Sequence, residues 1–82
     1  MVVAKRVLRI DGADTAEGVE ITLFAPVQRE GGWSCRYEIA WPEAPRAGDG
    51  WGSDAMQAIH MTLQRIGIDL YMSEHHAAGR LR

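Results

Sequence analysis

The segment W-S-C-R-Y-E-I-A-W, residues 33–41, decides the fold. Its apolar and aromatic side chains stand at every second position, from Trp33 through Tyr37 to Trp41, and polar side chains such as Arg36 stand between them. Alternation with a period of two is typical of a β-strand that has one face on a core and the other in water. Pro42 lacks a backbone donor and ends the pattern. We therefore expect a strand over residues 32–41.

Two further strand patterns precede this segment. Residues 18–25 alternate around Val19 and Ile21 and stop before Pro26, and residues 2–10 form an apolar-rich run that ends at an Asp-Gly pair. The connections between the runs are short, which favours hairpins over crossovers. The sequence therefore predicts a three-stranded antiparallel meander.

A long helix is predicted after the strands. Ser53 stands where a helix N-cap belongs, and large apolar residues then recur at steps of three and four. Gly67 costs about 1 kcal/mol relative to alanine inside a helix. The pattern continues past Gly67, so we expect the helix to reach about Met72, and an end at Gly67 is the alternative. The predicted core-facing stripe consists of Met56, Ile59, Leu63, Ile66 and Leu70.

Length and cysteine content bound the architecture. The chain has 82 residues and one cysteine. This length predicts one domain over residues 1–82, and a single cysteine excludes an internal disulfide framework. Cys35 lies in the inward register of its strand and is expected to be a small buried hydrophobe. The expected fold class is α+β, with the three-stranded meander followed by one long helix packed on one sheet face (βββα). Whether residues 77–82 form a short final strand stays open.

Charge and hydropathy narrow the class of partner. Nine Lys and Arg residues against eleven Asp and Glu residues, with a formal net charge of −2, give no electrostatic case for binding nucleic acid. No apolar run approaches the roughly 18 residues that a membrane span requires. We also expect no secretory signal, because no long apolar stretch follows the basic residues near the N-terminus. The expectation is a small cytoplasmic domain with no nucleic-acid or membrane partner.

The predicted helix carries a second apolar arc, which bears on function. At about 100° per residue, Met61, Ile68 and Met72 gather about 180° from the centre of the predicted core stripe, with Arg65 between them. A helix that is apolar on two opposite faces needs cover on both. We interpret these four residues as a partner interface, most simply that of a homodimer.

The same arc is compatible with two arrangements that involve no partner. The C-terminal tail could fold back over it, or the three apolar residues could be ordinary exposed side chains. An unpaired edge strand of the meander could, in addition, recruit a partner by strand addition.

Residues 42–52 form a long connector that is rich in proline and glycine. A loop of this length in a small domain is either functional or mobile. Trp41 and Trp51 bracket it, and with Asp49 they are the residues at which a small ligand would be sought first. Glycines before a helix N-terminus could also admit an anion, but no phosphate-loop pattern follows, so a flexible connection is favoured.

No residue set in the sequence indicates catalysis, a cofactor or a metal ion. His75 and His76 are adjacent, so they diverge by about 100° on a helix, and together with His60 they match no metal-ligand spacing. A solvated helix end is the expected place for the adjacent pair. Cys35 has no histidine nearby in the sequence that would activate it. We therefore expect a non-enzymatic protein-interaction module without a cofactor, and a small-ligand-binding domain is the alternative.

Two segments resemble a family of small bacterial domains of unknown function. They read W-x-C-x-Y-x-I over residues 33–39 and G-x-D-x-x-Q-A-I over residues 52–59. This resemblance implies a strand that leads through a variable loop to a helix, and it brings no activity. A looser resemblance in topology is to the HicB-type antitoxins, and it implies an antitoxin-like partner-binding domain. The residues that carry this likeness are Pro42, Gly52, Ser53, Gln57 and Ala58. The sequence departs from that family because it lacks the acidic Pro-Asp-like ending of the strand.

Overall fold

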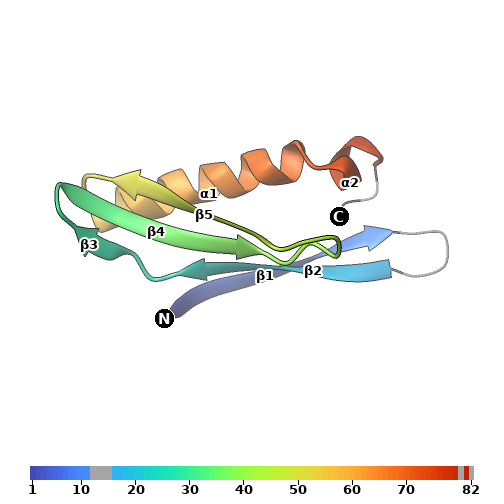
Figure 1. The fold of residues 1–82 in the computed structure, drawn as a ribbon, viewed down its shortest axis with the longest axis horizontal. Coiled ribbons are helices and arrows are strands. Elements are labelled where there is room, and N and C mark those ends of the chain that lie inside the picture. Colours follow the sequence, from blue (N-terminus) through green and yellow to red (C-terminus); the bar gives the residue numbers. More distant parts are fainter. Residues whose placement is uncertain (12–15, 80, 82) are drawn as a thin grey trace.

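An antiparallel sheet forms one layer of the molecule and a long helix forms the other (Figure 1). The computed structural model describes residues 1–11, 16–79 and 81 and measures 47 × 22 × 18 Å. The strands are β1 (Val2–Asp11), β2 (Ala16–Phe24), β3 (Val27–Arg29), β4 (Gly32–Ile39) and β5 (Arg46–Gly52), and the helices are α1 (Ala55–Tyr71) and α2 (Glu74–Ala77).

The sheet contains the predicted meander and two strands more. β1 pairs with β2, and β2 pairs with β4, each time antiparallel. After Pro26 the chain continues along the same edge of β4 as the short strand β3, while β5 pairs along the opposite edge, since Trp33 has partners in both strands. The α+β class and the antiparallel pairing are confirmed. The expected number of three strands is wrong, because the sheet has five.

Strand β5 lies within residues 42–52, which the sequence pattern assigned to a flexible connector. Glycine is depleted in strands, so a glycine-rich run gives no strand signal by composition. Here the glycines occupy alternate positions on the face toward the helix, and each stands opposite a residue of β4 that is in the core or packs against it. The pairs are Trp33 with Gly52, Cys35 with Gly50 and Tyr37 with Gly48.

The glycines of β5 are required by close packing. A Cβ added at Gly50 would lie 2.7 Å from the Cα of Thr62 on α1, and one added at Gly48 would lie 2.8 Å from the ring of Tyr37. Both distances are shorter than van der Waals contact, so a side chain would push the helix or the tyrosine away. The hydroxyl of Thr62 also donates to the carbonyl oxygen of Cys35 at 3.0 Å, which joins α1 to β4.

The ends of α1 follow from its capping groups. Asp54 is the N-cap, and its carboxylate accepts a hydrogen bond from the backbone N–H of Gln57 at 2.8 Å. The predicted N-cap, Ser53, lies one residue earlier and instead donates to the Gln57 side chain through its backbone N–H and its hydroxyl. The helix passes through Gly67 and has its C-cap at Met72, which confirms the longer of the two expected helices.

The face of α1 that packs on the sheet differs from the predicted stripe. Its buried residues are Ala58, Thr62 and Ile66. Met56 and Leu63 belong to the predicted stripe, but they are 81% and 54% exposed. The reason is the close approach to β5, which leaves room only for small side chains at the centre of the contact. The large apolar side chains therefore lie on the two flanks of the helix.

The core lies between α1 and the central strands. Cys35, Tyr37 and Ile39 of β4 and Val19 of β2 are completely buried. The expectation for Cys35 is confirmed, and its thiol donates to the carbonyl oxygen of Phe24 at 3.2 Å. Within the described ranges no helix is both long and apolar enough to cross a bilayer.

The end of the chain returns to the sheet. Ser73 caps α2, and its hydroxyl oxygen accepts a hydrogen bond from the backbone N–H of His76. Leu81 then forms an isolated antiparallel bridge with Ile10 of β1. Residue 81 thus adds one bridge to the sheet, and residues 80 and 82 lie outside the described residues.

Candidate functional site

The residues of the predicted interface lie together on one flank of α1. Around the helix axis they fall on one side of Thr62, at angles of about 60° to 120° from the sheet contact. Met61 is 38% exposed, Ile68 is 61% exposed and Met72 is 75% exposed. Arg65 is exposed as well. We call Met61, Arg65, Ile68 and Met72 the edge-side flank.

The edge-side flank points beyond the edge of the sheet that β5 forms. The opposite flank of α1, which includes Leu63 and Leu70, lines a groove with Ala4 of β1 and therefore faces the β1–β2 side. The edge-side flank must then face the other way, past β5. Among the described residues β5 pairs only with β4, so the backbone groups along its outer edge have no strand partner. An unpaired strand edge is a template for another strand.

The described part of the C-terminal segment does not cover this flank. His75 of α2 packs against Trp41, after β4, and Leu81 pairs with Ile10 at the far edge of the sheet. Met72, at the end of α1, keeps three quarters of its surface exposed. Cover by a folded-back tail is therefore not found for the residues that the structure describes.

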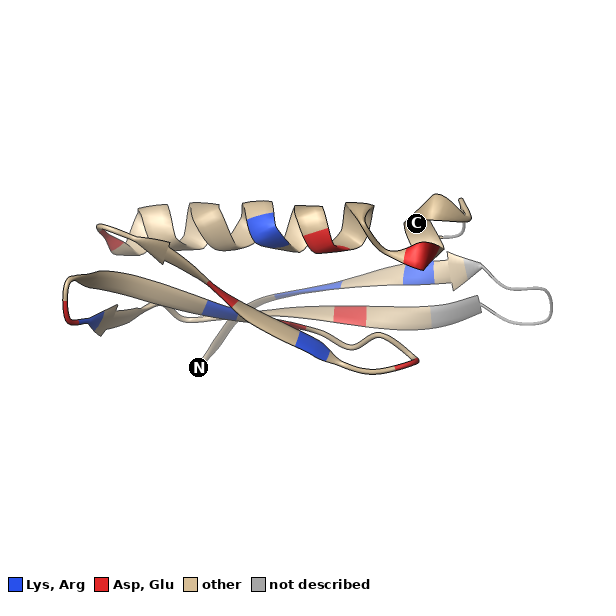
Figure 2. Ribbon diagram, turned by 45° about the horizontal axis from the view of Figure 1, so that its top comes forward, with Lys and Arg blue, Asp and Glu red and all other residues tan. Residues whose placement is uncertain are grey.

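Helix α1 has an unusually low charge for a surface helix. Figure 2 shows a basic and an acidic band along it, which are Arg65 and Asp69, the two charged residues among its 17. A surface helix ordinarily carries charged side chains on the face turned to water. Here that surface also exposes Met56 and Tyr71. The exposed surface of α1 is therefore more apolar than that of an ordinary surface helix.

Asp69 belongs to a polar cluster that fixes α1 to the sheet. The hydroxyl of Tyr37 donates to the Asp69 carboxylate, and Nε of Arg46 lies 3.0 Å from the same oxygen. The side chain of Asp69 is 10% exposed. Burial raises the pKa of Tyr37, the hydrogen bond to Asp69 raises it further, and the guanidinium groups of Arg65 and Arg46 oppose the rise. The Tyr37 hydroxyl therefore stays protonated and serves as a hydrogen-bond donor to Asp69.

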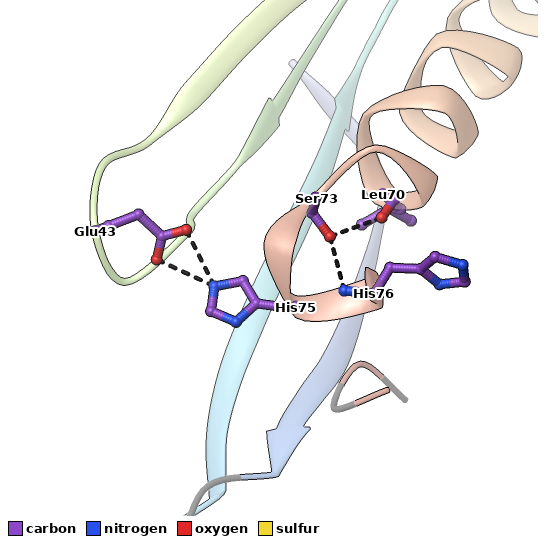
Figure 3. A network of polar contacts seen from close by, with 5 residues as sticks. All are labelled: Glu43, Leu70, Ser73, His75 and His76. Carbon is purple, nitrogen blue, oxygen red and sulfur yellow. Dashed lines mark hydrogen bonds and ion pairs between the residues drawn. The ribbon is translucent and has the colours of Figure 1, made fainter. Parts of the chain in front are cut away.

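A second cluster joins α2 to the loop after β4 (Figure 3). Nε2 of His75 lies 3.0 and 3.2 Å from the two carboxylate oxygens of Glu43. The imidazole ring stacks on the indole of Trp41 with 5.3 Å between ring centroids. The backbone N–H of Glu43 is the main cause of the lowered pKa of that carboxyl, and His75 contributes. The expectation of a solvated helix end is wrong for His75, whose side chain is 14% exposed.

The candidate ligand residues of the sequence do not converge. Asp49 and Trp51 alternate with the glycines of β5 and therefore stand on the sheet face away from α1, where Trp51 is exposed. Trp41 packs against the core beside His75. A cleft of about 450 Å³ between the loop after β4 and the start of α2 includes Trp41 but neither of the other two residues.

Comparison with known proteins agrees with the two motifs found in the sequence. The family model described as Domain of unknown function (DUF6968) matches residues 4–82. No curated protein and no solved structure matches the chain. The likeness to the HicB-type antitoxins finds no support in these comparisons. The family match confirms the resemblance to a small domain of unknown function and carries no activity with it.

Proposed function

The chain belongs to the DUF6968 family, and we propose that this member is a non-enzymatic protein-interaction module that pairs with a second copy of itself. The observation that carries the proposal is the position of two unpartnered surfaces side by side. The outer edge of β5 lacks a strand among the described residues, and the apolar edge-side flank of α1 overhangs that edge. One partner can satisfy both surfaces.

A two-fold pairing along β5 fits the dimensions of strands and helices. Paired strands lie about 4.8 Å apart. Because Thr62 contacts both Gly50 of β5 and Cys35 of β4, α1 lies over both strands and inside the edge. In such a dimer the two-fold axis lies half a strand spacing outside β5. A helix whose axis lies half a strand spacing inside β5 is then about 10 Å from its symmetry mate, which is a normal distance between packed helices. The joined sheets then carry two adjacent helices on one face.

The side chains at this contact suit self-association. A two-fold interface brings the same patch of each protomer together, so the patch must be complementary to itself. Met61, Ile68 and Met72 carry no charge, and methionine adapts its shape to irregular surfaces. Arg65 lies at the sheet side of the flank, close enough to Tyr37 to oppose the rise in the pKa of its hydroxyl, so its charge need not stand between the apolar side chains when they meet.

The alternative of a small-ligand site between Trp41 and Trp51 is less well supported, because the two indoles lie on opposite faces of the sheet. The antitoxin-like alternative would use the same edge and flank for a different protein. It differs from our proposal in the identity of the partner.

Light scattering coupled to size exclusion tests the proposal over a range of protein concentrations. We expect the wild type to elute as a dimer and the double variant Met61→Glu/Ile68→Glu to elute as a monomer, because four buried charges would face each other in the dimer. Met56→Glu is the control, since Met56 is also an exposed apolar residue of α1, at 81% exposure, but lies on the opposite flank. A wild type that stays monomeric at every concentration, or a control that dissociates like the double variant, contradicts the proposal.

A further inference from the structure

The part of the sheet that α1 leaves uncovered forms an apolar groove beside the helix. Ile21 and Leu23 of β2 form its floor, and Ala4 of β1 extends it. Leu63 and Leu70 of α1 form the facing wall, and the volume is about 280 Å³. This groove lies on the flank of α1 opposite the edge-side flank, so it is separate from the proposed dimer contact.

An arginine, Arg6, lines the groove. Arg6 stands opposite Ile21 in the β1–β2 register, which places it on the inward row of β1 with Ala4 and Leu8. It lines the groove, and it forms no ion pair with any of the residues that the structure describes. Its neighbour Lys5 also borders the groove, but the Lys5 ammonium is engaged by Glu20 at 2.9 Å. An arginine on an otherwise apolar inward row offers a guanidinium to an anion at the mouth of the groove.

Gly67 is a second, independent feature of the groove wall. Glycine destabilises a helix interior relative to alanine, so it needs a reason at this position. Its φ is not positive, and a Cβ added there would meet nothing within 4 Å. Packing within the protomer therefore does not require this glycine. The missing side chain keeps the upper rim of the groove open for a molecule from outside.

We propose that the groove binds a small amphiphilic carboxylate, with its apolar chain between β2 and α1 and its carboxylate on Arg6. The apolar floor and wall exclude a strongly polar ligand, and the volume lies just below the range of about 300–1,000 Å³ typical of small-molecule pockets, which excludes a large cofactor. Arginine binds carboxylates in a two-point geometry, so a carboxylate head group fits the guanidinium of Arg6.

A competing role for Arg6 makes the proposal testable. β1 is an edge strand, and an inward-pointing charge is one way in which proteins prevent edge strands from pairing. In that case Arg6 would repel other strands and would contribute nothing to ligand binding.

The test uses the full chain and three probes of equal chain length, namely decanoate, decanol and decylammonium, each below its micellar concentration. Two-dimensional NMR of the amide groups reports both the site and the affinity. We expect decanoate to shift the resonances of groove residues, decanol to bind about tenfold more weakly or worse, and decylammonium to bind most weakly. Equal affinity for decanoate and decanol overturns the proposal, and so does an absence of decanoate shifts in the groove.

Variants on β1 locate the anion site. We expect Arg6→Gln to weaken decanoate binding about tenfold, and Ala4→Leu, which fills the floor and keeps the charge, to weaken it as well. Arg9→Gln is the matched control, because Arg9 lies on the same strand but pairs with Gly18 on the outward row. Equal effects of Arg6→Gln and Arg9→Gln contradict the proposal. The double variant Met61→Glu/Ile68→Glu is expected to bind decanoate normally, so failure of the dimer and failure of the groove are distinguished.

Discussion

Gly50 and Gly67 occupy regular secondary structure for opposite reasons, although both are glycines inside an element. Gly50 allows the backbone of α1 to approach β5, so that a Cβ would overlap Thr62. Gly67 faces open space on the surface of the helix. The residue type alone says nothing about this difference, because it depends on what lies across from each position.

Alanine substitutions at these two positions are predicted to change stability in opposite directions. Gly50→Ala overpacks the contact and is expected to lower the free energy of unfolding by about 1–3 kcal/mol. Gly67→Ala adds a Cβ without a clash and is expected to raise it by up to about 1 kcal/mol. Urea unfolding measured by circular dichroism checks both values. An unchanged or more stable Gly50→Ala protein would show that the helix does not rest on the strand as described.

The ion pair between Lys5 and Glu20 gives a residue-scale prediction for pH. The hydrogen bond from Lys5 and then its charge hold the pKa of Glu20 below its ordinary value of 4.5. A lowered carboxylate pKa contributes stability that is fully present above the unfolded value and is lost as the pH falls through the folded value. Lys5→Met is expected to return the pKa of Glu20 toward 4.5 and to reduce the acid sensitivity below that pH. NMR titration of the Glu20 carboxyl group measures the shift.

Arg9→Met on the same strand is the control for this titration, because Arg9 pairs with Gly18 and not with Glu20. A pKa of Glu20 that stays equally low in the Lys5→Met protein would assign the effect to another group.

At the scale of elements, the attachment of α1 to the sheet depends on one carboxylate near its C-terminal end. Asp69 receives a hydrogen bond from Tyr37 of β4 and an ion pair from Arg46 of β5. Removing one donor leaves a nearly buried carboxylate with less compensation, which is costly. The cluster therefore fixes the position of the helix along the two strands that carry it.

Tyr37→Phe is predicted to lower the free energy of unfolding by about 1–3 kcal/mol, because it removes the donor to Asp69 and keeps the ring over Gly48. Tyr71→Phe, at an exposed position on α1, is the matched control and is expected to change stability by less than about 0.5 kcal/mol. Equal unfolding midpoints for the two variants would mean that the Tyr37 hydroxyl contributes nothing to holding the helix.

Three elements could be predicted well from the sequence, and two strands could not. The strands around Val19 and Tyr37 and the full length of α1 follow from the spacing of apolar residues. β3 has three exposed residues and no periodic signal. β5 contains three glycines on its inward row, so it shows no apolar alternation. The sequence feature that could have indicated this strand is the spacing of the glycines, which stand at every second position, like the inward residues of β4 with which they pair.

The candidate surfaces divide in the same way. The edge-side flank could be predicted, because helix geometry alone brings residues 61, 65, 68 and 72 to one side. The predicted core stripe lies to one side of the true contact. The prediction looked for large apolar side chains, but the helix meets the sheet through the small residues Ala58 and Thr62, and its large side chains lie on the flanks. The hydrogen bond between Tyr37 and Asp69 joins residues that are 32 positions apart in the sequence, so no local sequence pattern predicts it.

For the whole molecule, the placement of the helix determines which surfaces remain available. α1 lies over β4 and β5 at one side of the sheet and not over its centre (Figure 1). The displacement leaves an apolar groove above β1 and β2, and it leaves an apolar flank beyond the edge of β5. Both proposed contacts thus have one cause, and each can be tested without disturbing the other.

The glycines of β5 also bear on how the chain assembles. A strand whose inward positions lack side chains has almost no apolar surface of its own to bury, so water competes with its pairing until α1 arrives. We therefore expect β5 and α1 to become ordered together and to be lost together, as one cooperative unit.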